Sequence, residues 1–197
     1  MTDQTAQPQS LLADLHEKAR VDHVFAVSSG KGGVGKSTVA SLLAVSLARR
    51  GYRVGILDAD VTGPSIPQAF GLGNKLTSED GLLHPLVSTG GIQIMSVNLL
   101  LEDPTNPVVW RGPIVGNVIK QFWTDVVWDV DVLIVDMPPG TSDVPLTVFQ
   151  SIPLEGIVMV ATPQDLVSLI VAKATRMAEM MNVSVLGLIE NQAWMTC

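Results

Sequence analysis

The stretch that decides the fold is residues 24–40, which reads VFAVSSGKGGVGKSTVA. An apolar, β-branched run passes into a glycine-rich turn, and a helical pattern begins behind it. Gly30, Gly35, Lys36 and Ser37 match G-x-x-x-x-G-K-[ST], in which backbone N–H groups turn onto phosphate oxygens. The lysine of this pattern reaches the β- and γ-phosphates, and the serine hydroxyl ligates magnesium. The stretch therefore predicts a loop that binds a nucleoside triphosphate with Mg²⁺, in front of a helix whose N-terminus favours anions.

The same glycines allow a second interpretation. Gly30, Gly32 and Gly35 also spell G-x-G-x-x-G, and Asp58 follows about 20 residues later, as in a dinucleotide-binding fold. That fingerprint makes no use of the lysine and serine that follow, whereas a triphosphate with magnesium uses both. The triphosphate interpretation is favoured for this reason.

Composition limits the remaining function classes. The 197 residues are 47% hydrophobic, which suits one domain built on a fully covered parallel sheet. The formal charge of −7 argues against a nucleic-acid partner, and no apolar run reaches the roughly 18 residues of a membrane span. Cys197 is the only cysteine, so no disulfide can form within the chain, which predicts a reducing cytoplasm.

The order of apolar runs predicts the fold class. Residues 1–21 are expected to form a flexible N-terminal segment with a short helix over 11–20, and residues 22–197 one P-loop ATPase domain. Strands are predicted near 24–28, 53–57, 131–135, 156–161 and 184–189, a hairpin at 81–97, and helices at 36–50, 110–127 and 162–181. Strands alternating with helices predict an α/β fold, a doubly wound, mainly parallel sheet in three α/β/α layers.

Carboxylates are predicted at the carboxyl ends of two of these strands. Asp58 and Asp60 leave the second strand, and burying them is costly unless they meet water, a metal or a cation. A turn or a helix cap is the simpler interpretation; we favour a role in positioning magnesium or the attacking water. The run DVLIVD ends in Asp136, in the form of a Walker B segment, and is predicted to bind the magnesium shell or Ser37. The N–H of Gly140, in the loop that follows, is predicted to face the γ-phosphate.

Lys31 narrows the choice among families of phosphate-loop proteins. KGGVGKS, with a lysine directly after the first glycine, resembles the deviant Walker A group of ATPases. That group includes the MinD and ParA partition ATPases, the nitrogenase iron protein and the arsenical pump ATPase. The resemblance implies that Lys31 reaches across a nucleotide-sandwich dimer to the phosphates of the partner.

Five further motifs resemble the Mrp/ApbC family of iron–sulfur cluster carrier proteins. They are DADVTGPSIP (58–67), WRGP (110–113), DMPPGTSD (136–143), TPQDLVSL (162–169) and IENQAWMTC (189–197). The resemblance covers residues 22–197 and implies an ATP-binding and ATP-hydrolysing homodimer. Such a dimer holds a [4Fe–4S] cluster and passes it to apo iron–sulfur proteins, with neither nucleic acid nor membrane as a partner.

The resemblance also implies a role for individual residues. The phosphates would be held by Gly30, Lys31, Gly32, Gly33, Val34, Gly35, Lys36, Ser37 and Thr38. Asp60 would position the attacking water and act in catalysis with Lys31 and Lys36. Ser37 and Asp136 would hold magnesium, and Asn191 would contact the adenine edge. Asp58 and Gly140 complete the predicted nucleotide site.

The C-terminal motif departs from that family. The family usually has ENMSYF before a C-x-x-C pair, whereas this sequence reads ENQAWM, and Cys197 aligns with the first cysteine of the pair. Two copies of the chain offer two thiolates, while a four-iron cluster is held by four. We therefore expect these residues alone not to hold a [4Fe–4S] cluster stably, and the sequence to be a fragment that lacks the last helix and strand of the family.

Two other functions stay open from the sequence. A partition or positioning ATPase of the MinD/ParA type would need an amphipathic C-terminal helix or a basic DNA-binding face, and the sequence displays neither. A regulatory module that holds nucleotide without turnover is the third possibility.

Overall fold

The computed structural model describes residues 12–60, 63, 65–73, 76, 78–79, 82–100, 112–140, 143–163 and 169–194. Within them, one sheet has seven strands in the order β5-β6-β2-β7-β1-β8-β9. Its strands are β1 (Arg20–Ser29), β2 (Val54–Asp58), β5 (Leu86–Val87), β6 (Gln93–Ser96), β7 (Asp129–Asp136), β8 (Gly156–Ala161) and β9 (Ser184–Glu190). A separate antiparallel pair joins β3 (Ser78–Glu79) to β4 (Leu82–Leu83).

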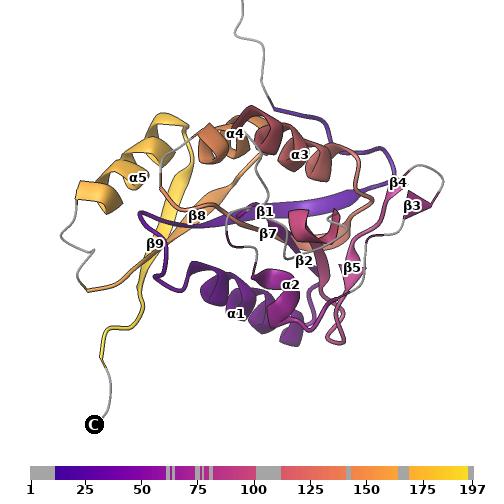
Figure 1. Cartoon of the computed structure of the whole chain (residues 1–197), viewed down its shortest axis with the longest axis horizontal. Coiled ribbons are helices and arrows are strands. Elements are labelled where there is room, and N and C mark those ends of the chain that lie inside the picture. The colour runs from indigo at the N-terminus through magenta and orange to yellow at the C-terminus, as the bar shows by residue number, and fades with distance from the viewer. Residues whose placement is uncertain are drawn as a thin grey trace, which may run out of the picture.

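Helices flank the large sheet on both faces. They are α1 (Lys36–Arg49), α2 (Ile66–Ala69), α3 (Gly112–Thr124), α4 (Asp143–Ser151), α5 (Leu169–Met180) and the 3₁₀ turn η1 (Val97–Leu100). Figure 1 shows α3, α4 and α5 above the sheet and α1 and α2 below it. Every pairing in the sheet is parallel except that of β5 with β6. The predicted doubly wound, three-layer α/β/α fold is confirmed.

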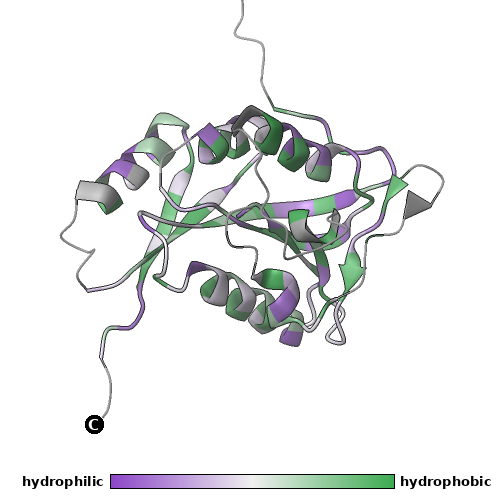
Figure 2. Ribbon diagram, in the orientation of Figure 1, coloured by the Kyte–Doolittle hydropathy of each residue, from purple (hydrophilic) through white to green (hydrophobic). Residues whose placement is uncertain are grey.

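The core lies on both faces of the central strands, as a parallel sheet requires. All five residues of β2 are buried, and so are the last five of β7. Figure 2 shows hydrophobic residues in the helices on both sides of the sheet, whereas the amino end of β1 is hydrophilic. The indole N–H of Trp128 donates to the Phe122 carbonyl at 2.9 Å, and that of Trp123 to the Ala13 carbonyl at 2.8 Å. Both tryptophans are buried and are therefore packing groups.

The predicted lead-in helix over 11–20 is wrong for the described residues 12–19, which are not helical. The Ala13 N–H donates to the Ser151 carbonyl at 2.9 Å, and its carbonyl accepts from Trp123. These contacts fasten an irregular segment to α3 and α4. A helix of ten residues is marginal by itself in water, so tertiary contacts decide the conformation.

The predicted hairpin at 81–97 is only partly confirmed. Leu86–Val87 and Gln93–Ser96 pair antiparallel, and Gly91 N–H donates to the Ser88 carbonyl at 2.9 Å in the turn between them. β6 also pairs parallel with β2, from Gly55 opposite Gln93 to Asp58 opposite Ser96. The second strand of the hairpin is thus a strand of the main sheet, and its carboxyl end lies beside that of β2.

Strand β9 closes the other edge of the sheet. Six of its seven residues are exposed, including Val185, Leu186 and Leu188.

None of the helices in the described part of the chain has the length and apolar character needed to cross a bilayer.

Candidate functional site

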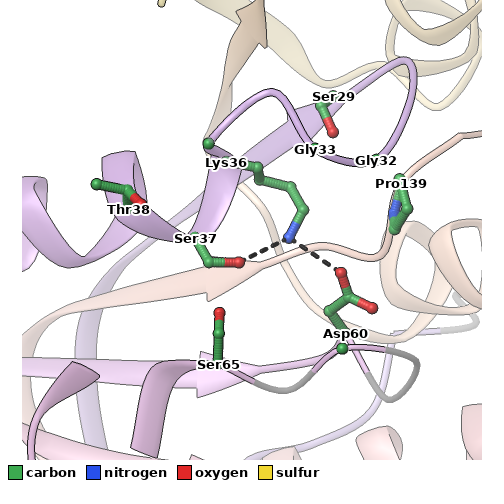
Figure 3. Close-up of a pocket in the computed structure, with 11 residues that line it drawn as sticks. Ser29, Gly32, Gly33, Lys36, Ser37, Thr38, Asp60, Ser65 and Pro139 are labelled. Carbon is green, nitrogen blue, oxygen red and sulfur yellow. Dashed lines mark hydrogen bonds and ion pairs between the residues drawn. The ribbon is translucent and has the colours of Figure 1, made fainter. Parts of the chain in front are cut away.

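The candidate site is an open pocket of about 350 Å³ where β1 and β2 end. Parallel strands bring their carboxyl ends to one edge of a sheet, and open α/β sheets bind ligands there. The pocket is lined by Ser29, Gly32, Gly33, Gly35, Lys36, Ser37, Thr38, Asp60, Gly63, Ser65 and Pro139 (Figure 3). Six of these residues belong to the phosphate loop that the sequence predicts.

Glycine is required at two positions of this loop. Gly33 has φ of +82° and Gly35 has φ of +85°, a left-handed conformation that costs other residues roughly 1–2 kcal/mol. Gly35 is the N-cap of α1, and its carbonyl accepts the first helical hydrogen bond from Val39 N–H at 3.0 Å. Val34, between the two glycines, is buried and anchors the loop in the core. The loop therefore leads directly into a helix N-terminus, which favours a bound anion.

Lys36 is buried and paired with two carboxylates. Its Nζ lies 2.7 Å from Asp136 Oδ1 and 3.4 Å from Asp60 Oδ2. It also donates to Ser37 Oγ at 3.3 Å, as the dashed lines to Ser37 and Asp60 in Figure 3 indicate. The residues predicted to meet at the phosphates thus come together from β2, β7 and the start of α1.

The second oxygen of Asp136 identifies a position for a cation. Asp136 Oδ2 is buried and has no hydrogen-bond partner among the described residues. Burial raises the pKa of Asp136, and the charge of Lys36 opposes that rise. A carboxylate and the Ser37 hydroxyl are oxygen ligands of the kind that Mg²⁺ prefers, with phosphates and waters completing its shell. These residues fit a magnesium ion.

Asp58 is held behind the pocket and does not line it. Ser96 Oγ donates to its Oδ2 at 3.0 Å, and Asp60 N–H donates to its Oδ1 at 3.2 Å. Burial, followed by the negative charge of Asp136, raises the pKa of Asp58 to about 7. In this structure the carboxylate of Asp58 supports the backbone at Asp60, and its predicted contact with the cofactor stays a prediction.

Two other predicted ligands contact the protein itself. The Gly140 N–H, which is predicted to face the γ-phosphate, donates to the Ser29 carbonyl at 3.0 Å in this structure, and its contact with phosphate stays a prediction. The bond closes the loop after β7 onto the end of β1, and a phosphate contact would require it to open. The side-chain amide of Asn191 donates to the Val34 carbonyl at 2.9 Å, which places Asn191 against the phosphate loop.

Of the remaining predicted residues, Gly30 is buried at the start of the loop, Lys31 is exposed and Cys197 is outside the described part. Lys31 is exposed on the loop, and its carbonyl accepts from Ser29 Oγ at 2.9 Å. Cys197 lies outside the described residues, as do residues 110–111, 141–142 and 164–168 of the family motifs.

The sequence prediction did not include Ser29, Ser65, Ser96 or Pro139. Ser96 could have been found, because a strand parallel to β2 would end beside Asp58. Residues 92–97 were assigned only to a hairpin, so their parallel pairing with β2 was not predicted.

Comparisons with known proteins place the chain among P-loop NTPases. A family model described as ParA, NUBPL iron-transfer P-loop NTPase, matches residues 20–197. The iron–sulfur cluster carrier protein of Clostridium perfringens is 49% identical over 186 residues, which are 90% of this chain and 66% of that protein. The protein of the same name from Escherichia coli is 45% identical over 90% of this chain and 48% of its own length. The chain thus spans between about half and two thirds of these relatives.

Solved structures agree with the sequence comparison. A nucleotide-binding protein from Archaeoglobus fulgidus in complex with ADP has a TM-score of 0.79 and 45% identity, over 90% of this chain and 69% of that one. The septum site-determining protein MinD of Pyrococcus horikoshii, complexed with Mg-ADP, has a TM-score of 0.59 and 18% identity, over 87% and 70%. The second likeness concerns the fold alone.

Proposed function

The chain belongs to the family of NUBPL iron-transfer P-loop NTPases, and from this premise we propose that it binds and hydrolyses ATP and carries iron–sulfur clusters to apo-proteins. The observation that carries the proposal is the arrangement of Lys36, Asp60 and Asp136 at the phosphate loop. Sequence identity of 45–49% with proteins named iron–sulfur cluster carriers supports the cargo. A MinD-type positioning role has weaker support, since MinD is 18% identical.

The nucleotide would lie in the pocket in front of α1. Backbone N–H groups of the loop and the positive end of the helix would bind the phosphates. Adenine is the favoured base, because a relative with 45% identity was solved in complex with ADP. Asn191 Nδ2 is used by Val34, so its Oδ1 is the atom that would accept from the adenine amino group.

Binding would rearrange the charges around Lys36. In the structure Lys36 forms ion pairs with Asp136 and Asp60, and arriving phosphates would draw its ammonium away from them. Ser37 Oγ and Asp136 would then hold Mg²⁺, which supplies charge neutralisation at the β- and γ-phosphates. This exchange makes phosphate binding and cation binding mutually dependent.

Hydrolysis would use Asp60 as the group that orients water. Its carboxylate lines the pocket next to Lys36, and an oxygen there can accept a hydrogen bond from a water aimed at the γ-phosphorus. Attack by the water oxygen breaks the bond to the β–γ bridging oxygen, and ADP and phosphate leave. We propose that turnover is slow, because a carrier needs a nucleotide-dependent state more than a high flux.

Lys31 and a second protomer would complete the site. Lys31 is exposed on a loop that faces the phosphate position, and in the deviant Walker A group the corresponding lysine reaches the partner. We propose a homodimer in which each Lys31 contacts the phosphates bound by the other protomer. The cytoplasm is the proposed location, because a reducing environment keeps cysteine thiolates available for iron.

Cys197 would be the cluster ligand of this chain. It is the only cysteine in the 197 residues, so a dimer supplies two of the four thiolates of a [4Fe–4S] cluster. The other two cluster ligands would be thiolates from outside these residues, and small thiols can replace them in vitro. The cluster is cargo, released to apo iron–sulfur proteins.

Anaerobic reconstitution with iron, sulfide and excess small thiol tests the cargo. With the added thiol in place of the two missing ligands, the wild-type chain should take up iron and sulfide with the absorption of a cluster and transfer them to an apo-enzyme that needs four irons; without added thiol it should hold no stable four-iron cluster. Cys197→Ser should lose both properties, whereas Ser184→Ala should keep them. Cluster-free wild-type protein, or a cluster unaffected by Cys197→Ser, would contradict the proposal. Release of phosphate from ATP, abolished in Asp60→Ala, tests the hydrolase separately.

A further inference from the structure

We propose that Asn191 is a positioning residue whose side-chain amide holds the phosphate loop in the conformation that receives phosphates. The inference rests on the proposed nucleotide site and adds a role other than reading the base. It also connects the loop to the end of β9, which lies 157 residues away in sequence. The conformation of the loop would then depend on β9, the strand that precedes Cys197 in the sequence.

The hydrogen bond from Asn191 reaches the loop where it leads into α1. Asn191 Nδ2 donates to the Val34 carbonyl at 2.9 Å in a partly buried position. A Cβ added at Gly35 would collide with the same amide nitrogen, so Asn191 also lies directly against the residue that begins α1. One side chain therefore contacts both residues at which the loop becomes a helix.

The chemistry of the loop explains why a donor is needed there. A loop that turns its N–H groups toward phosphates leaves carbonyls that must find partners elsewhere. Asn191 supplies a partner for the Val34 carbonyl, while the Val34 side chain is buried in the core. An aspartate of the same shape would place a carboxylate oxygen against the carbonyl oxygen, which is repulsive.

The backbone at Asn191 is itself fixed. Its N–H donates to the Ala161 carbonyl at 2.8 Å, at the point where β8 ends. β9 runs parallel to β8 up to Glu190 opposite Ala161. A displacement at the end of β9 would thus reach the loop through Asn191 and its side-chain hydrogen bond to Val34.

Hydrogen exchange of the nucleotide-free chain tests the contact directly. Asn191→Ala and Asn191→Asp should accelerate exchange of the amides in residues 31–38, and leave those of β7 at the wild-type rate. Ser184→Ala, at the exposed amino end of β9, is the matched control and should change neither. Unchanged exchange in residues 31–38 of both Asn191 variants would overturn the proposal, as would equal acceleration in β7, which would indicate general destabilisation.

Binding of magnesium tripolyphosphate and of Mg·ATP then separates positioning from base recognition. Asn191→Ala should weaken tripolyphosphate binding by a factor of about ten, the value that corresponds to losing one hydrogen bond, and should weaken ATP binding at least as much because the proposed adenine contact is lost as well. A loss confined to ATP would show that Asn191 only reads adenine, and would overturn the positioning role. If the wild-type chain binds neither ligand, the proposed nucleotide function fails, and the exchange data still decide whether Asn191 holds the loop.

Discussion

Three aspartates surround one lysine at the edge of the sheet. Lys36 Nζ pairs with Asp136 and Asp60, while Asp58 lies behind them on Ser96 and the Asp60 amide. One positive charge cannot balance three buried negative charges, so the site favours a proton or a cation. Burial is the main cause of the raised pKa of Asp58 and of Asp136, and the neighbouring carboxylates add to the rise.

Replacing the lysine should reveal how much this pairing contributes. Lys36→Met leaves Asp136 buried without its counter-ion, and breaking a buried pair costs about 3 kcal/mol. We expect this loss of unfolding free energy near neutral pH, and a smaller loss at acidic pH, where Asp136 takes up a proton. Urea denaturation at two pH values measures it. Lys173→Met, exposed on α5, is the control, and equal stability of the two variants at both pH values would contradict the assignment.

The pKa of Asp58 sets a pH dependence of stability. Because the folded-state pKa is about 7 against an ordinary 3.8, the folded protein retains a proton that the unfolded chain releases. The free energy of unfolding from this group therefore falls as pH rises from about 4 to 7. Asp58→Asn mimics the protonated acid, and its melting temperature should fall less than that of the wild type between about pH 5 and pH 8.

The comparison of the two melting curves assigns the pH dependence to Asp58 and to the charge of Asp136 that is coupled to it, because more distant groups contribute equally to both proteins. Glu179→Gln, exposed on α5, serves as the control and should follow the wild type. If Asp58→Asn shows the full wild-type dependence on pH, the buried carboxylate is not the source.

At the scale of elements, the central strands determine how closely the layers pack. β2 lies between β6 and β7, and all of its residues are buried. Gly55 in this strand faces Leu133 and Trp128, and a Cβ there would lie 2.8 Å from Leu133 Cδ1 and 3.0 Å from Trp128 Cζ3. The glycine is therefore a packing residue, because its missing side chain leaves room for its neighbours.

Gly55→Ala should lower the free energy of unfolding by about 1–3 kcal/mol through overpacking. Adding Leu133→Val removes the nearest methyl group and should recover part of that loss. Gly187→Ala in β9 is the matched strand glycine, since a Cβ there meets no atom within 4 Å. Chemical denaturation of the four proteins measures the effect, and similar midpoints for the two alanine variants would contradict it.

At the scale of the whole molecule, the site joins α1 to strands from the middle and from one edge of the sheet. The phosphate loop connects β1 to α1, Asp136 ends β7, and Gly140 N–H ties the next loop back to β1. Asn191 brings in β9 from the far edge. A ligand that binds these groups together should therefore stabilise the fold as a unit.

Mg·ADP at about one hundred times its Kd should add roughly 2.7 kcal/mol, or about 5–10 °C in melting temperature for a chain of this size. Thermal melting with ADP and Mg²⁺, with ADP and EDTA, and with neither measures the shift. We expect most of the stabilisation to require the cation, and Lys36→Met to show little of it. A shift that is the same with EDTA would contradict the roles of Ser37 and Asp136.

The sequence was a reliable guide wherever structure depends on neighbouring residues. The phosphate loop is contiguous, so its glycines, lysine and serine could be identified by spacing alone. Long apolar runs likewise located β1, β2, β7, β8 and β9. Asp60 and Asp136 could be predicted as site residues because ligands bind where buried parallel strands end.

By itself, then, the sequence determined the fold class, the phosphate loop and the positions of Asp60 and Asp136. Only the tertiary structure decided that β6 joins β2, that Ser96 supports Asp58, and that Gly140 N–H is used by Ser29. It alone brought Asn191 to Val34. The physical reason is range: spacing and hydropathy encode contacts within one element, whereas pairing between distant segments depends on how the whole chain packs.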